Sequence, residues 1–134
     1  VTDAGVDLSG EPTGQPKWSF ALGGNYRWMT DAGDVELSVR HAFHGAGRCN
    51  SDSLTQGSCS ASPNFTTNGA QNRTDLRLDW TSPESTWGAA AYVNNLFDNQ
   101  YVTGVGGLTR DVFGTATGSI TTPRQYGVEL SVHF

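Results

Sequence analysis

Few side chains in this sequence have the type and spacing that support chemistry. His41 and His44 are three positions apart, a spacing that brings two ligands together on one face of a helix. The residues around them alternate between apolar and polar as in a strand, where positions three apart point to opposite faces, so the two imidazoles diverge. Ser131 and His133 share a face of the last segment, but the spacing places no acid beside them, as a nucleophilic site would require. We therefore expect no enzyme activity, no metal site and no cofactor.

Cys49 and Cys59 bound the segment CNSDSLTQGSC, and their chemistry depends on the compartment. Two thiols without further ligands nearby are half a metal site. In an oxidising compartment the pair is expected to form a disulfide. Closing a loop of this length would stabilise the fold by about 2–3 kcal/mol, by restricting the unfolded chain. The bond would either stiffen a ligand-contacting loop or protect the loop from proteolysis.

Composition narrows the class of protein. The chain has 134 residues, enough for one domain, with 36% hydrophobic residues, 17 glycines and 16% charged residues. That mixture is typical neither of a coiled coil nor of a charged disordered tail. The net charge is −5, from 8 basic and 13 acidic residues, which argues against nucleic acid as a partner. No run of about 18 apolar residues predicts a transmembrane helix.

Alternation of apolar and polar residues is the main pattern. It covers five segments, at 17–29, 34–44, 73–80, 87–101 and 126–134. A period of two predicts strands with one apolar and one polar face, and no helical stripe of useful length competes with it. The clearest polar positions in the third segment are Arg73, Asp75, Arg77 and Asp79. The sequence therefore predicts an all-β protein.

The connections between these strands are of two lengths. Residues 30–33 and 82–85 are tight turns rich in Gly, Pro, Asp and Ser, whereas 45–72 and 104–121 are long. Short turns on one side and long loops on the other predict an antiparallel up-and-down transmembrane β-barrel. The short turns would be periplasmic and the long loops extracellular. A soluble β-sandwich alternates in the same way and is the structural alternative.

Tryptophan placement favours the membrane barrel. Trp28, Trp80 and Trp87 flank the short turns, and Trp18 lies ten residues before Trp28. At about 3.3 Å per residue and a tilt near 40°, ten steps climb roughly 25 Å, the height of a lipid-facing band. Indole prefers the membrane–water boundary, so the four residues are predicted to form an aromatic girdle.

The polar side of the strands would then line the lumen. Its charges either contact a solute or another occupant of the lumen or pair with one another across strands, and pairing is the favoured interpretation. The charged residues concerned are Arg73, Asp75, Arg77 and Asp79, with Glu36, Arg40 and Glu129 on the same side. His41 falls on the outward side near the extracellular end.

Two stretches resemble a known family. The segment YGVELSVHF resembles the C-terminal assembly signal of outer-membrane proteins, which the barrel-insertion machinery reads, through Tyr126, Val128, Leu130, Val132 and Phe134. The segment YVNNLFDNQYVTG resembles the NLFD-x-x-Y segment of TonB-dependent receptors, through Asn95, Leu96, Phe97, Asp98 and Tyr101. Residues 8–26 are similar to the entry into a late strand of those receptors. The resemblance covers essentially the whole chain.

The resemblance implies that residues 1–134 are the C-terminal portion of a receptor barrel. They would be about five strands of a 22-stranded type, without the plug, the energy-coupling box and the earlier strands. It implies a multi-pass protein of the Gram-negative outer membrane. Its partners would be outer-membrane lipid, the barrel-assembly machinery and, through the missing plug, the TonB energy-transducing complex.

The implied function is to bind and import a bulky nutrient with energy from the TonB system. A ferric siderophore is the leading candidate, slightly ahead of an oligosaccharide. Candidate extracellular ligand contacts are Arg48, Phe65, Arg110 and Phe113. Neutral hydrogen-bonding side chains dominate the long loops and suit sugars at least as well. A porin-like passive channel and a soluble β-sandwich adhesin are the alternatives from other classes.

Overall fold

All regular structure in the described part of the chain is β-strand. The computed structural model describes residues 9–10, 15–47, 61–62, 65–66, 69–106, 114 and 117–134. The strands are β1 (Ser19–Thr30), β2 (Gly33–His44), β3 (Ala61–Ser62), β4 (Phe65–Thr66), β5 (Gln71–Thr81), β6 (Trp87–Asn94), β7 (Val102–Gly106), β8 (Thr117–Ile120) and β9 (Gln125–Val132). No helix long and apolar enough to cross a membrane occurs among these residues.

The chain divides into two units. One comprises residues 1–18, 45–70 and 101–121, and the other residues 19–44, 71–100 and 122–134. The first unit contains two short antiparallel ladders, β3 with β4 and β7 with β8. The connections expected at 45–72 and 104–121 are therefore long, as predicted, but they contain strand pairs of their own.

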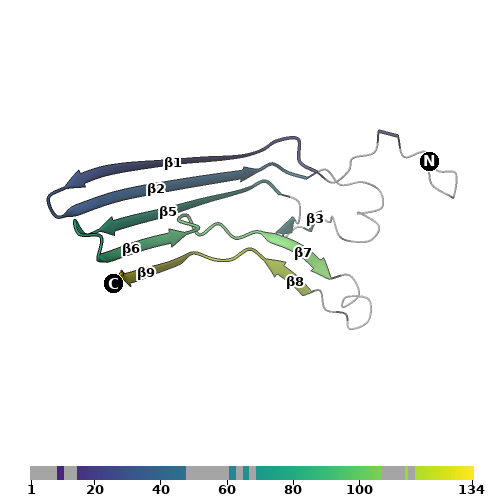
Figure 1. The fold of residues 1–134 in the computed structure, drawn as a ribbon. Coiled ribbons are helices and arrows are strands. Elements are labelled where there is room, and N and C mark those ends of the chain that lie inside the picture. The colour runs from purple at the N-terminus through teal and green to yellow at the C-terminus, as the bar shows by residue number, and fades with distance from the viewer. Residues whose placement is uncertain are drawn as a thin grey trace. The chain divides into compact units, whose positions relative to one another are not determined.

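The second unit is one five-stranded sheet in the order β1-β2-β5-β6-β9 (Figure 1). Each neighbouring pair is antiparallel, and neighbours follow one another in chain order, so the sheet is an up-and-down meander. Consequently β1, β5 and β9 run in the same direction. The sheet is open, with β1 and β9 at its edges. The prediction of an all-β, antiparallel architecture is confirmed.

The predicted end of the fourth strand is wrong. The prediction extended it to residue 101, but β6 stops at Asn94. Asn95 and Asp98 have φ angles of 56° and 53°. A chain in this left-handed region leaves the extended conformation, so the ladder cannot continue through these residues.

The register sorts side chains onto two faces, because directly paired residues in an antiparallel ladder point the same way. Three successive rows across all five strands contain no charged residue. These rows are Gly24, Val39, Leu76, Val93 and Tyr126, then Tyr26, Leu37, Leu78, Ala91 and Val128, then Trp28, Val35, Trp80, Ala89 and Leu130. We call this side the apolar face and the opposite side the polar face.

No core lies on either face within the sheet unit. The only apolar residue classed as buried among the described residues is Ala90, whereas Val128 is 74% exposed and Leu130 81% exposed. A soluble sandwich would cover such a face with a second layer. The sheet unit on its own is thus a single layer with an uncovered apolar face.

Gly33 is the tightest position of the turn between β1 and β2. Its φ is 123°, and a Cβ there would collide with the carbonyl oxygen of Thr81 and lie 2.8 Å from Nε1 of Trp80. We expect Gly33→Ala to lower the free energy of unfolding by about 2 kcal/mol, because strain and collision add. Urea denaturation in detergent measures the change. Gly24→Ala is the control, since a Cβ at Gly24 meets nothing within 4 Å; equal losses in both variants would contradict the explanation.

Candidate functional site

The two faces of the sheet are the candidate functional surfaces. The exposure of the apolar face is clearest in strand β9. Its apolar-face residues are exposed, and they are the residues of the predicted assembly signal, Tyr126, Val128, Leu130 and Val132, with Phe134 exposed just beyond the strand. The predicted alternation of this segment is confirmed. Recognition of the segment by an insertion machinery stays a prediction.

Three tryptophans gather at the turn end of the apolar face. Trp28 and Trp80 are both register partners of Val35, and Trp87 pairs with Val132 at the same end of the sheet. The indole N–H of Trp80 donates a hydrogen bond to the carbonyl oxygen of Ala32, at 3.0 Å. Their common level agrees with the prediction from the short turns.

Trp18 immediately precedes β1 and is exposed. Its carbonyl oxygen accepts a hydrogen bond from the backbone N–H of Gly45, at 2.8 Å. Whether it and the other three tryptophans meet a membrane boundary stays a prediction.

The two histidines of β2 lie on opposite faces, as predicted. His41 is on the apolar side, where its Nδ1 is 2.8 Å from Oγ1 of Thr74 on β5. His44 is on the polar side, paired in register with Ser19. No group of three or more His, Cys, Asp or Glu side chains that could hold a metal ion occurs in the described part of the chain.

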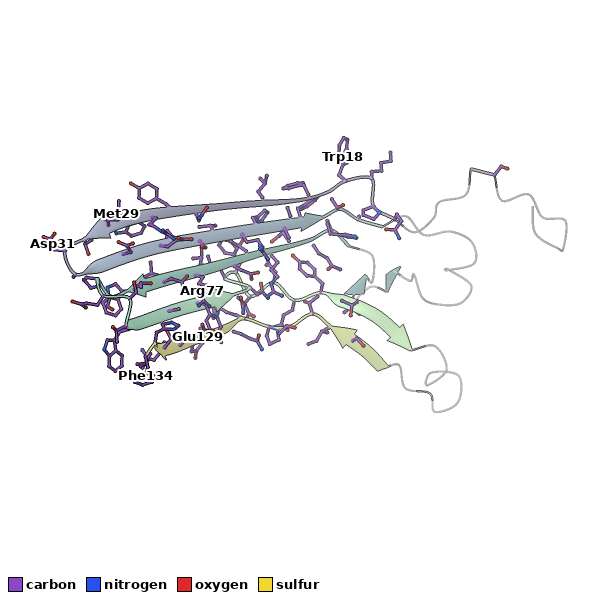
Figure 2. The ribbon with its side chains drawn as sticks, viewed as in Figure 1. Trp18, Met29, Asp31, Arg77, Glu129 and Phe134 are labelled. Carbon is purple, nitrogen blue, oxygen red and sulfur yellow. The ribbon has the colours of Figure 1, made fainter. Side chains whose placement is uncertain are left out.

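Arg77 is the centre of an ion-pair network on the polar face, and Figure 2 labels it and its partner Glu129. Its Nε lies 2.9 Å from Oδ1 of Asp79 on the same strand, and its Nη2 lies 2.7 Å from Oε2 of Glu129 on β9. The contact to Glu129 crosses β6 diagonally, because Arg77 pairs in register with Tyr92 on β6, whereas Glu129 pairs with Ala90. The small Ala90 beside this path leaves room for the guanidinium.

The remaining predicted lumen charges, apart from Arg40, are in ion pairs too. Arg73 Nε lies 2.8 Å from Oδ1 of Asp75, and Arg27 Nη2 lies 2.8 Å from Oε2 of Glu36 across the first hairpin. Apart from Arg40, these charges pair with one another, and only some of the pairs cross strands as the favoured interpretation expected. Two of these pairs, Arg73 with Asp75 and Arg77 with Asp79, run along one strand instead of across strands, because residues two apart share a face.

The motif NLFD forms a tight, hydrogen-bonded turn after β6. Asn95 is 2% exposed, and its amide nitrogen donates to the carbonyl oxygens of Asn99, at 2.9 Å, and Thr122, at 3.1 Å. Its amide oxygen accepts from the backbone N–H of Asn99 at 3.0 Å. Its own backbone N–H donates to Oδ1 of Asp75 at 2.8 Å. One side chain thus fastens the end of β6 to the segment that leads into β9.

The other residues of the motif have unequal roles. The backbone N–H of Leu96 donates to the carbonyl oxygen of Thr74 at 2.8 Å, while Phe97 is 64% exposed. Tyr101 belongs to the other unit, where its backbone exchanges hydrogen bonds with Thr121. Sequence reasoning identified the motif by resemblance alone. The residue types Asn and Asp are a further indication of a turn here, because these are the non-glycine residues that best tolerate a positive φ.

Asp98 gives the turn a dependence on pH. The backbone N–H of Arg124 donates to its carboxylate at 2.8 Å, and the amide of Gln100 does so more weakly at 3.4 Å; both lower the pKa of Asp98 below its ordinary 3.8. The folded pKa lies below the unfolded one, so the stabilisation is complete above the unfolded pKa and disappears as pH falls through the folded pKa. We expect the urea concentration at the unfolding midpoint to decrease as the pH is lowered below about 4. Asp98→Asn should reduce this dependence on pH. Asp31→Asn, at an exposed turn position, should leave the dependence unchanged, and equal effects would contradict the assignment.

Several predicted residues lie outside the described part of the chain. They are Cys49 and Cys59, and the candidate ligand contacts Arg48, Arg110 and Phe113. Phe65 is described only as part of the backbone of β4. The disulfide and the extracellular ligand contacts therefore stay predictions.

Comparisons with protein-family models, with curated proteins and with solved structures return no match. The geometry of the two faces therefore carries the functional argument. One face can contact hydrocarbon, and the other can contact water, ions and polar solutes.

Proposed function

We propose that this chain forms part of the wall of an outer-membrane β-barrel, with its apolar face against lipid and its polar face toward the lumen. The observation that carries the proposal is the separation of charge between the faces. All three central rows of the apolar face lack charge, while the polar face carries the ion pairs centred on Arg77. Hydrocarbon accepts such an uncovered apolar face, and water does not.

Lipid also explains why strand charges are confined to one side. An arginine or lysine on the lipid face of a barrel costs about 2–4 kcal/mol at the bilayer midplane, whereas lumen positions tolerate charge. The paired arginines, Arg27, Arg73 and Arg77, follow that rule. The tryptophans at the turn end fit the boundary between lipid and water.

Within this class we propose a TonB-dependent receptor of the outer membrane. The support is the resemblance of Asn95–Asp98 with Tyr101 and of the final strand to that family, together with the meander of antiparallel strands. The whole receptor would bind a bulky nutrient, with a ferric siderophore as the leading candidate, and import it by energised movement of a plug. Lipid, the barrel-assembly machinery and the TonB complex would be its partners.

Brominated lipids test the membrane part of the proposal. In vesicles whose acyl chains carry bromine, tryptophan fluorescence is expected to be quenched, because Trp28, Trp80 and Trp87 lie on the apolar face. Substituting Trp87 by phenylalanine should remove part of the quenched signal. A protein that stays soluble without detergent, with fluorescence unaffected by lipid, would reject the proposal in favour of a soluble β-protein.

Uptake by cells tests the receptor part. A strain lacking the gene should lose accumulation of a radiolabelled ferric siderophore, and collapsing the proton gradient should abolish the same accumulation in the parent strain. Uptake that survives loss of the gradient would indicate a passive channel. Loss of oligosaccharide uptake with iron uptake intact would assign the other cargo.

A further inference from the structure

Arg40 lies near the carboxylate of Asp75 and interacts with it electrostatically, but forms no ion pair among the described residues. Its register partner on β5 is Asp75, whose carboxylate is already held by Arg73 and by the backbone N–H of Asn95, both at 2.8 Å. The next arginine on that side, Arg77, is held by Asp79 and Glu129. Among the described residues, Arg40 is the strand arginine of this face without an ion pair.

Open space lies beside this charge. On β1 the register partner of Arg40 is Gly23, and a Cβ built there would meet only the carbonyl oxygen of Val39, at 3.7 Å. The space belongs to an open groove of about 650 Å³ across the polar face, which Asn25, Ser38 and Tyr92 also line. That volume is in the range of small-molecule sites, about 300–1,000 Å³.

The chemistry of the groove selects one kind of ligand. A guanidinium is a planar fork of donors that matches a carboxylate in a bidentate way. Ser38 lies two positions from Arg40 on the same strand and face, and its hydroxyl can donate to or accept from a ligand hydroxyl. Asp75 and Glu129 also line the groove, so an anion with several charges would be repelled.

We propose that Arg40, with Gly23 and Ser38 beside it, forms a binding site for the carboxylate of a small hydroxylated acid such as a sugar acid. The guanidinium binds the carboxylate, the space over Gly23 holds the body of the ligand, and Ser38 bonds a ligand hydroxyl. The site depends only on the polar face, so it is independent of whether lipid covers the apolar face.

Gluconate is the probe for this site, and sorbitol is its neutral counterpart. In the full chain purified in detergent, the Nε–H signal of Arg40 in a nitrogen–proton NMR spectrum should shift and saturate with gluconate and not with sorbitol. Arg40→Gln should weaken gluconate binding about tenfold or more, because a charge-assisted bidentate contact is lost. Lys17→Gln removes the same charge from an exposed position before β1 and should leave binding within about twofold.

Two adjacent glycines give a matched pair that changes no charge. Gly23→Val fills the space beside Arg40 and should weaken gluconate binding about tenfold, whereas Gly24→Val adds the same side chain to the opposite face and should leave it unchanged. Valine suits a strand, so both variants are expected to fold. This pair tests the site even if Arg40→Gln does not fold.

Three results would overturn the proposal: no saturable gluconate binding, equal weakening by Lys17→Gln and Arg40→Gln, or equal effects of the two valine variants. Sorbitol binding as tight as gluconate binding would overturn the carboxylate assignment as well. Gluconate binding in a protein whose tryptophans are not quenched by brominated lipid would reject the membrane proposal alone.

Discussion

Val128→Arg is expected to lower the free energy of unfolding in a phospholipid bilayer by about 2–4 kcal/mol. Val128 lies in the middle row of the apolar face, is 74% exposed, and has the apolar partner Ala91. In lipid its replacement would place a guanidinium in hydrocarbon, far from water and from any opposite charge. Urea titration of the protein folded into lipid vesicles measures the loss.

Gln125→Arg is the matched control for this prediction. Gln125 belongs to the same strand, β9, but lies on the polar face, where it pairs in register with Asn94. The same new side chain should change stability there by no more than about 0.5 kcal/mol. Equal, small effects of both substitutions would mean that water covers the apolar face, and the membrane proposal would fail.

Asn95→Asp is expected to lower the free energy of unfolding by about 3 kcal/mol or more. The amide nitrogen of Asn95 donates to two carbonyl oxygens, of Asn99 and Thr122, and a carboxylate cannot replace either bond. The side chain is 2% exposed, and its backbone N–H is bonded to the carboxylate of Asp75, so the new negative charge would be buried beside another. Urea denaturation in detergent measures the effect.

Two variants separate the hydrogen bonds from the backbone conformation. Asn95→Gly accepts the φ of 56° without strain and removes the side chain, so it should destabilise less than the aspartate variant, by about 1–3 kcal/mol. Gln100→Ala removes an exposed amide nearby and should cost at most about 0.5 kcal/mol. An aspartate variant as stable as the parent protein would show that the buried amide does not hold the turn.

The strands and their faces could be predicted because a period of two reports directly which side a residue occupies. In β2 the sequence placed Leu37 and Val39 on one side and Glu36 and Arg40 on the other, and the register agrees. The common level of Trp28 and Trp80 followed from the short turns, because a tight turn leaves little freedom in the register.

Other features could not be predicted because they depend on contacts between distant residues. The end of β6 at Asn94 is set by the turn at Asn95, whose partner Thr122 is 27 residues away. The pair of Arg77 with Glu129 spans 52 residues and crosses β6 beside the small Ala90. Alternation identifies a polar face, but it does not show that Arg40, among the described residues, forms no ion pair.

The shared direction of β1 and β9 limits how this sheet can be completed. If the edge strands β1 and β9 paired with each other, the pairing would be parallel, whereas the other four strand pairs are antiparallel. A closed barrel in which every pair of neighbouring strands is antiparallel needs an even number of strands. The five strands of this sheet therefore require an odd number of further strands. One additional hairpin, with two strands, cannot close such a barrel. Three additional strands can, and so can the seventeen that a barrel of about 22 strands would supply.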